Sequence, residues 1–483
     1  MHAAAIRSAT YVASIFALYV AGAMLVPAAV DIYYGNSDWA VFAISALATG
    51  GLAIATAIAT HSQRPVLTTR FAFLVVTVLW ATLGVVGALP FYAASLKLDF
   101  ASAVFESVSA ITTTGSTVIV GLDHAPPGIL MWRSVLQWIG GIGVIALGLF
   151  LLPILKVGGF SYLRIESSDI EDKPFSRLNS LSQALLAIYL GLTILCAIAY
   201  SAAGMRLFDA VNHAMTTIAT GGFSTHDASF GYYDGYAVRW VGTVFMLLAA
   251  LPFSILIVIT LRGRLDAGRD PQIRLFASYV TAFVLVIALE RSIRADVPFP
   301  EALTAAAFNF VSIISTAGFA SEDYTTWGSL AVMLAFLATF VGGCSGSTAG
   351  GIKAYRFLIM GRMLQNGFHM LIYPDAVRSL SYGNRVVDAE MQRSVVLFMV
   401  SFLAVWAFSS TALAANGLDL VTSLTASLTA LTNVGPGLGP VVGPAGNFSS
   451  LSDFAKWVLT VTMLLGRLEI LAVLVLLTPS FWR

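Results

Sequence analysis

The stretch Thr112-Thr113-Thr114-Gly115 is the starting point for this chain, because the same short pattern returns three more times. Each further copy also ends on a glycine, and the copies are Ala219-Thr220-Gly221-Gly222, Ser315-Thr316-Ala317-Gly318 and Thr432-Asn433-Val434-Gly435. Successive final glycines are roughly 100 residues apart, a period typical of a chain built from repeated units. The pattern therefore predicts four similar units.

Each copy lies in the same setting. An apolar span precedes it, a short helical stretch leads directly into it, and a second apolar span follows. The short helices are expected at 99–112, 207–219, 300–314 and 418–431. Segments of this length are too brief to cross the hydrocarbon core of a membrane. They must enter and return, as the pore segments of ion channels do.

The residue types of the pattern suit a dehydrated alkali cation. Backbone carbonyl oxygens replace the water around such an ion without adding fixed charge, and glycine reaches the backbone angles that turn successive carbonyls toward one axis. Each short helix also begins near an acid, which suits its positive N-terminal end. These acids are Asp99, Asp209, Glu301 and Asp419. The alternative is that the glycines only let membrane helices pack closely.

Composition places the chain in a membrane. Of its 483 residues, 58% are hydrophobic and 11% are charged, whereas soluble proteins carry about 25% charged residues. The net charge of +1 gives no indication of a nucleic-acid partner. Cys196 and Cys344 both lie in apolar stretches, so no disulfide framework is expected. No group of His, Cys, Asp and Glu has the sequence spacing of a metal site.

The sequence predicts an all-α polytopic membrane protein with a pseudo-fourfold pore. Its spans are expected near 10–31, 39–60, 71–92, 129–155, 183–203, 240–261, 274–290, 328–360, 394–415 and 454–478. The first two spans contain no copy of the pattern and form an N-terminal helix pair outside the fourfold plan. The resulting division is 1–64 for this pair and 65–165, 166–265, 266–385 and 386–483 for the four pore units.

The distribution of basic residues predicts the orientation. An even number of spans puts both termini on one side, and most Lys and Arg fall on that side, above all in 156–180, 262–274 and 353–393. The positive-inside rule then makes both termini cytoplasmic, with the four loops descending from the outer face. Arg133 and Lys456 are counted among the few outer charges. A regulatory partner is expected to dock on the three inner segments, although some of their charges serve topology and contact with anionic membrane lipid.

A second glycine-rich stretch interrupts the span at 328–360. It reads Gly342-Gly343-Cys344-Ser345-Gly346-Ser347-Thr348-Ala349-Gly350-Gly351-Ile352-Lys353 and is called the intramembrane loop below. Such a composition does not sustain a regular helix. The loop lacks the Gly-Lys-Ser/Thr ending of a phosphate-binding loop, so a nucleotide site is rejected. It is interpreted as a gate that lies in the permeation path below the filter; the alternative is a passive kink.

Arg467 is an intramembrane arginine in the last span. Such a charge costs at least about 2.5–3.5 kcal/mol at the membrane centre, so it must face a partner or a wet cavity. Glu469, two residues on, cannot share its helix face. Arg467 is interpreted as a fixed positive charge beside the cavity under the filter, which limits cation occupancy. The alternative is a salt bridge to a carboxylate elsewhere in the chain.

With these features together, the sequence resembles the TrkH branch of the Trk/Ktr/HKT superfamily of potassium transporters. The resemblance covers nearly the whole chain and rests on the four patterns, the intramembrane loop, Gly466-Arg467-Leu468-Glu469 and the N-terminal helix pair. It implies channel-like potassium uptake through a single-chain pseudo-tetrameric pore, in a homodimer of the bacterial inner membrane. It also implies a cytosolic TrkA-like regulatory subunit that binds nucleotide and controls the gate. Potassium is then the substrate, and no other bound cofactor is expected.

The potassium sites are expected at the two middle positions of each pattern. These positions are Thr113, Thr114, Thr220, Gly221, Thr316, Ala317, Asn433 and Val434. Two other classes of function stay open. A symporter coupled to protons or sodium, with a midplane site, also shows repeats and broken helices, but four repeats in one orientation with re-entrant loops favour a pore. A membrane-embedded enzyme would need a nucleophile–base set or metal ligands within the spans, and the sequence offers neither.

Overall fold

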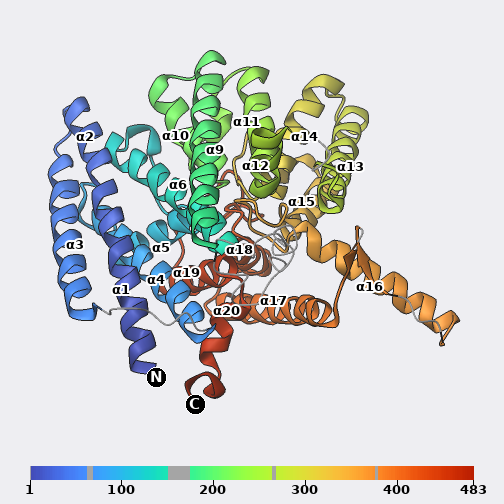
Figure 1. Ribbon diagram of the computed structural model, residues 1–483. Coiled ribbons are helices and arrows are strands. Elements are labelled where there is room, and N and C mark those ends of the chain that lie inside the picture. The colour runs from blue at the N-terminus through green and yellow to red at the C-terminus, as the bar shows by residue number, and fades with distance from the viewer. Residues whose placement is uncertain (1, 62–68, 151–173, 264–267, 376–378, 384) are drawn as a thin grey trace.

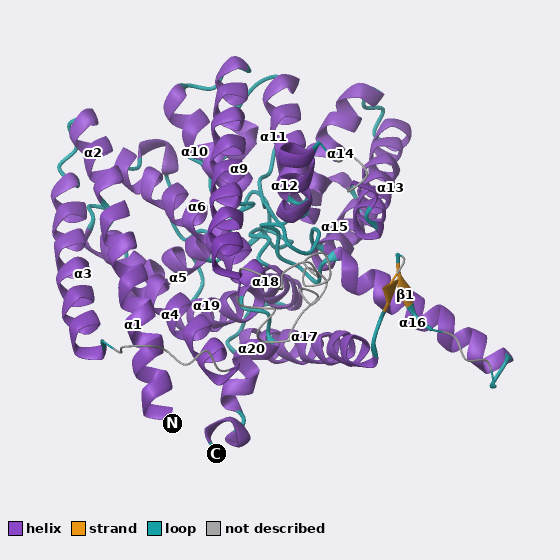
Figure 2. Cartoon of the chain, viewed as in Figure 1, coloured by secondary structure: helices purple, strands orange, loops and turns teal. Residues whose placement is uncertain are grey.

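The computed structural model describes residues 2–61, 69–150, 174–263, 268–375, 379–383 and 385–483. This part of the chain is almost entirely helical, as the sequence predicts, with one short two-stranded ribbon (Figure 1, Figure 2). The N-terminal helices lie at one side of the molecule, and both ends of the chain lie at the lower edge in Figure 1.

The N-terminal helices form the pair expected outside the repeats. Their bounds are α1 His2–Ala23, α2 Leu25–Tyr34 and α3 Trp39–Thr60, and α1 and α2 together make one span. Large apolar side chains on α3, such as Leu47 and Leu52, are exposed, as on a helix that faces lipid. Asp31 of α2 accepts a hydrogen bond from the backbone N–H of Gly128 over 2.7 Å. This bond anchors the pair on the first pore unit.

Four units follow with a common order: a long helix, a short buried helix, a loop and a second helix. Unit one contains α4 Thr69–Ala93, α5 Phe100–Ile111, η1 Leu122–His124 and α6 Pro127–Phe150. Unit two contains α9 Pro174–Ala202, α10 Leu207–Ile218, η3 Ser229–Tyr232, α11 Tyr236–Ala249 and α12 Phe253–Arg262. Unit three contains α13 Pro271–Arg294, α14 Phe299–Ile314, η5 Tyr324–Trp327, α15 Ser329–Val341, α16 Ala354–Ile372 and the antiparallel strands β1 Ser381–Tyr382 and β2 Arg385–Val386. Unit four contains α17 Ala389–Ala415, α18 Leu420–Thr432, α19 Asp453–Arg467, α20 Leu471–Leu474, η6 Val475–Leu477 and η7 Pro479–Trp482.

The short helices α5, α10, α14 and α18 form almost where the sequence predicts them. Protein surrounds them, and every residue of α5 from Ala101 to Ile111 is buried. Two of the expected acids cap these helices, since Asp99 accepts from Ser102 N and Asp419 accepts from Thr422 N. The other two acids lie in the first turns of α10 and α14. All four carboxylates therefore lie at the positive ends of the helix dipoles.

Within the described residues, seven segments are long and apolar enough to cross a membrane, or nine if each bent helix pair counts as one span. The bent pairs are α11 with α12, at 97°, and α19 with α20, at 106°. The span expected at 328–360 is interrupted as predicted. Its first part, α15, has 13 residues, and α16 leaves the bundle and projects from it (Figure 1). The second helices of units two, three and four are thus all broken.

Two large clusters of buried apolar side chains hold the units together. One cluster joins the N-terminal pair with units one and four, and the other lies mainly in units two and three. The expected unit boundaries near 64, 165 and 265 lie outside the described residues, as do residues 156–173 of the first basic segment.

Candidate functional site

Each short helix ends in the same backbone arrangement. The second residue of every pattern has a positive φ, and these residues are Thr113 (52°), Thr220 (50°), Thr316 (56°) and Asn433 (56°). In unit one the next N–H, that of Thr114, donates to the carbonyl of Ser109 over 2.9 Å, and the equivalent bond forms in the other three units. This is the left-handed helix end that proteins usually build with glycine.

Threonine at three of these left-handed positions is unusual, because a β-branched side chain disfavours positive φ. Backbone strain of this kind persists where the surrounding structure enforces it, often at functional sites. The residue after each left-handed position keeps a negative φ, and the final glycine is again positive. Such alternation turns successive carbonyls to the same side of the chain, which is the arrangement that a cation-binding loop needs.

The four final glycines form a closed ring with their neighbours. Each glycine packs against the carbonyl oxygen of the third pattern residue in the next unit, and the fourth unit returns to the first. The pairs are Gly115 with Gly221, Gly222 with Ala317, Gly318 with Val434 and Gly435 with Thr114. A Cβ at any of the first three glycines would overlap that oxygen, and one at Gly435 would lie 2.8 Å from it. Glycine is thus required by close approach as well as by φ.

The intramembrane loop packs against the helix ends that carry this ring. The N–H of Gly350 donates to Thr316 Oγ1 over 2.7 Å, and the N–H of Gly351 donates to the carbonyl of Thr432 over 2.9 Å. The hydroxyl of Thr348 lies 3.1 Å from each of two backbone carbonyls of unit two. The intramembrane loop therefore contacts units two and four as well as its own unit three. A passive kink does not require such contacts.

Arg467 ends α19 and reaches the same loop. Its Nη1 donates to the carbonyl oxygen of Thr348 over 2.9 Å, while Nε and Nη2 are buried without a hydrogen-bond partner. The side chain is 6% exposed and lines a narrow cavity together with Gly350 and Asn433. Among the described residues Arg467 forms no ion pair, so the alternative of a salt bridge is not found there.

Glu469 has partners that the sequence did not reveal. It pairs with Arg356 at the start of α16, and its Oε1 lies 3.9 Å from Lys353 Nζ at the end of the intramembrane loop. All three side chains are buried. Lys353 and Arg356 are therefore not part of an exposed inner surface, and their place on the cytoplasmic side stays a prediction. The sequence signal for this pairing was that Lys353 and Arg356 are three residues apart, about one helical turn, at the edge of an apolar span.

Two expected outer charges are also buried. Arg133 is 1% exposed and bonds to Thr117 and Ser224, and Lys456 is 6% exposed, with its Nζ donating to Ser102 Oγ over 2.9 Å. Their expected place on the outer side of the membrane stays a prediction, but neither side chain is exposed there. One turn after Arg133, Gln137 donates to the carbonyl of Gly221 over 2.6 Å. One carbonyl expected to face the ion is therefore also held by the protein.

The outer mouth carries His226 between two carboxylates. Its Nδ1 lies 2.5 Å from Asp123 Oδ1, its Nε2 lies 3.5 Å from Asp209 Oδ2, and its ring stacks on Tyr232. Burial by itself lowers the pKa of His226, but the two carboxylates outweigh it and raise the pKa above its ordinary value. For the Asp123 carboxyl, burial alone would raise the pKa. The hydrogen bond to His226 outweighs burial, and the pKa of Asp123 is lowered below its ordinary value.

Known proteins are similar to this chain over most of its length. Residues 40–483 match the family TrkH, described as cation transport protein. The chain belongs to the TrkH family. It is 42% identical over 412 residues to the Trk system potassium uptake protein TrkI of Halomonas elongata, covering 85% of this chain and 84% of that protein. It is 36% identical over 490 residues to TrkH of Escherichia coli K12, covering 99% of each.

A solved structure of a TrkH protein has the same fold. The crystal structure of the potassium transporter TrkH from Vibrio parahaemolyticus matches with a TM-score of 0.92 at 36% identity, covering 99% of both chains. The resemblance and the all-helical multi-span fold are thereby confirmed. Because the TrkH family consists of cation transport proteins, the expectation of a transporter rather than an enzyme is confirmed as well.

Proposed function

We propose that this chain carries potassium into the bacterial cell across the inner membrane, through a filter made of the four repeated patterns. The observation that carries the proposal is the closed ring of four glycines, each packed on a carbonyl oxygen of the next unit. A ring of this kind surrounds one axis with backbone oxygens and adds no fixed charge, which suits a dehydrated monovalent cation. The names of the relatives, potassium uptake proteins, support potassium as that cation.

The ion is proposed to bind at the second and third positions of the patterns. Two oxygens there, Thr113 Oγ1 and Asn433 Oδ1, are buried without a hydrogen-bond partner and are available to a cation. The short helices support the same site, because their negative C-terminal ends meet at the filter loops. The division of the chain into an N-terminal pair and four pore units, 1–64 and then 65–165, 166–265, 266–385 and 386–483, is part of this proposal.

The intramembrane loop is proposed to be the gate, and Arg467 the charge barrier beside it. The bonds from Gly350 and Gly351 hold the loop against the inner side of the filter. The unpaired guanidinium adds a positive charge at the same level, where low polarity strengthens its repulsion of a cation. Conduction then requires the loop to move, as order–disorder switches do in other proteins.

Control of the gate is proposed to come from a TrkA-like cytosolic subunit that binds nucleotide. Both termini are proposed to be cytoplasmic, which puts the segments 156–180, 262–274 and 353–393 within its reach. The ion pairs of Glu469 with Lys353 and Arg356 support a path for this control, because they tie the end of the loop to the start of α16. A displacement of α16 by the regulatory subunit would therefore also displace the end of the intramembrane loop.

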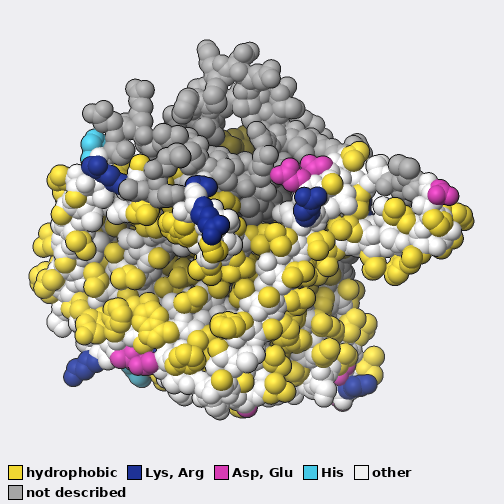
Figure 3. All heavy atoms as spheres, turned by 90° about the horizontal axis from the view of Figure 1, so that it is seen from below, with side chains coloured by type: hydrophobic (Ala, Val, Ile, Leu, Met, Phe, Trp, Pro, Cys, Tyr) yellow, Lys and Arg dark blue, Asp and Glu magenta, His cyan; other side chains and the backbone are white. Residues whose placement is uncertain are grey.

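A homodimer is proposed on the arm formed by α16. This helix projects from the bundle, and Figure 3 shows hydrophobic side chains over the projecting arm. Leu364, Phe368, Leu371 and Ile372 are all more than half exposed. A surface of this kind on a projecting helix is typical of a contact with a second protein chain.

Isotope flux into proteoliposomes tests the proposed function. Each inward potassium ion gains about 2.3 kcal/mol per 100 mV of inside-negative potential, so a pore conducts without a coupling ion. We expect potassium uptake driven by the potential alone, at a higher rate than sodium uptake. Uptake that needs a proton or sodium gradient would favour the symporter instead.

A further inference from the structure

Each short helix braces the filter loop that follows it through a side chain. In units one, three and four the short helix holds the loop backbone just after the ring glycine, and in unit two it holds the hydroxyl of Ser224. The bracing and braced residues are Glu106 with Thr117 and Val118, His213 with Ser224, Asn309 with Ser321, and Thr425 with Leu438. The four braces use a carboxylate, an imidazole, an amide and a hydroxyl. Only the carboxylate of unit one carries a full charge balanced by a second side chain.

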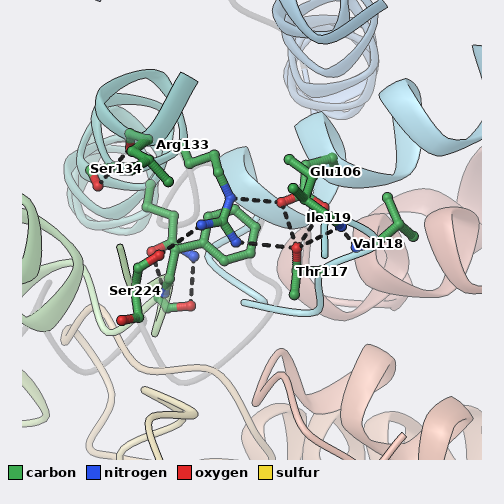
Figure 4. Close-up of polar contacts among 11 residues, drawn as sticks. Glu106, Thr117, Val118, Ile119, Arg133, Ser134 and Ser224 are labelled. Carbon is green, nitrogen blue, oxygen red and sulfur yellow. Dashed lines mark hydrogen bonds and ion pairs between the residues drawn. The ribbon is translucent and has the colours of Figure 1, made fainter. Parts of the chain in front are cut away.

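The brace of unit one is a buried ion pair (Figure 4). Arg133 Nε lies 2.8 Å from Glu106 Oε1, and the two side chains are 1% and 0% exposed. Glu106 accepts a hydrogen bond from the Val118 N–H over 2.9 Å and another from the Thr117 hydroxyl over 2.9 Å. Thr117 Oγ1 also accepts from Arg133 Nη2 over 3.1 Å. The pair thus holds the loop of unit one from two sides.

The same arginine reaches the loop of unit two. Figure 4 shows the Arg133 side chain extended between Glu106 on one side and Ser224 on the other. Its Nη1 donates to the carbonyl of Ser224 over 2.8 Å, and its guanidinium lies 4.0 Å above the ring of Phe223, the residue after a ring glycine. Gln137, on the same face of α6, accepts from the Phe223 N–H over 3.1 Å.

A charged pair is a costly way to brace a single loop. Removing two charges from water costs more than their attraction returns unless the hydrogen-bond geometry is very good, and packed neutral residues are often as stable. Units three and four use neutral braces, which shows that one loop does not need a charge. What the guanidinium adds is a rigid fork of donors that point in different directions. Such a fork fixes two loops relative to each other.

We propose that the Glu106–Arg133 ion pair is a specificity-determining positioning element, which sets the spacing between the filter loops of units one and two. The inference rests on the proposed function, since it concerns the selectivity of the same filter. Neither side chain needs to touch the ion. The pair acts through the backbone that follows Gly115 and Gly222, and its loss lets the two ring contacts widen. A wider ring discriminates less between potassium and sodium.

The test measures the ratio of potassium to sodium uptake in proteoliposomes that contain the full chain. The double variant E106Q/R133Q removes both charges together, because either single change would leave an unpaired buried charge. R133K keeps the positive charge but loses the fork. The control is E290Q/R294Q, which removes an ion pair within α13 of unit three, 3.6 Å long, whose arginine is largely exposed. Folded protein is counted by size-exclusion chromatography.

We expect the ratio to fall about fivefold in E106Q/R133Q and in R133K, which is the factor that corresponds to one net hydrogen bond. The control should keep the wild-type ratio. Thr117→Val leaves both charges in place and removes only the hydroxyl between them, so it is expected to fold and to lower the ratio about twofold. A purely structural role would reduce the amount of folded protein and leave the ratio unchanged.

Two results separate this inference from the proposed function. If the wild-type protein prefers potassium and every folded variant keeps that preference, the positioning role of the pair is overturned while the filter stands. If the wild-type protein itself shows no preference for potassium, the proposed function fails first.

Discussion

The guanidinium of Arg467 and the carbonyl oxygen of Thr348 are joined by a hydrogen bond of 2.9 Å. The sequence predicts a charge barrier and a loop barrier in series, and the structure brings the two into direct contact. The two expected barriers therefore form one assembly, in which α19 of unit four holds the loop of unit three. A change in either part is expected to weaken the other.

We expect Arg467→Ala to raise potassium flux, measured without the regulatory partner, by about tenfold or more. The change removes an unpaired buried charge and the bond that holds the loop, and each 1.4 kcal/mol taken from a barrier is a factor of ten. Arg467→Lys keeps the charge and is expected to raise flux less. Flux is measured per folded molecule in proteoliposomes. A well-folded Arg467→Ala protein that conducts no faster than wild type would show that Arg467 is not a barrier.

Gly350→Ala tests the seating of the loop. A Cβ at this position would overlap the carbonyl oxygen of Thr432, so the loop cannot keep its place below the filter. We expect increased flux with unchanged preference for potassium, as for a deletion of several residues within 346–350. Gly361→Ala on α16 is the matched control, because its Cβ would meet open space. Lower flux in folded Gly350→Ala would contradict the gate.

The combination of these two variants gives an independent check. Because Arg467 and the loop share a contact, their effects on the barrier are expected to be less than additive. If the fold-increase in flux of the double variant equals the product of the two single fold-increases, the charge and the loop act separately, as the sequence alone predicts.

The outer mouth should respond to pH through His226. A raised pKa means that the stabilisation is fully present below the ordinary pKa of histidine and is lost as pH rises through the raised value. Asp123 acts at the acidic end of the pH range. Because its pKa is lowered, the stability that its carboxylate contributes is present above the ordinary pKa of aspartate and is lost as pH falls through the lowered value. The groups that face the imidazole are Asp123, Asp209, Tyr232 and Tyr233.

The measurement is the melting temperature of the purified protein as a function of pH. We expect it to fall by a few degrees as pH rises through the raised pKa of His226, and His226→Gln should flatten this dependence. His124→Gln, at an exposed histidine of η1, is the control. The same pH dependence in His226→Gln would assign it to other groups.

The repeated pore units could be predicted because their signals are local. Each helix end, each acid near a helix start and each ring glycine lies within one short stretch, and the period of the chain repeats it four times. The intramembrane loop was visible for the same reason, since its composition breaks a helix. All these features depend on residues close to one another in the sequence.

The ion pairs that join different helices could not be predicted from the sequence. Glu106 with Arg133 and Arg356 with Glu469 connect different helices, and nothing near Arg133 distinguishes it from a charge that sets topology. The contact of Arg467 with the loop also depends on the packing of two units. Only the fold supplies such distances.

Potassium and sodium uptake by single Gly→Ser variants of the ring glycines tests the central claim most directly. Wild type and the variants at Gly115, Gly222, Gly318 and Gly435 are compared in proteoliposomes under an inside-negative potential. We predict that wild type prefers potassium and that each folded variant loses part of this preference, least at Gly435, where a Cβ would lie 2.8 Å from the carbonyl oxygen, the longest of the four distances. Unchanged ion preference in all four folded variants would contradict the filter.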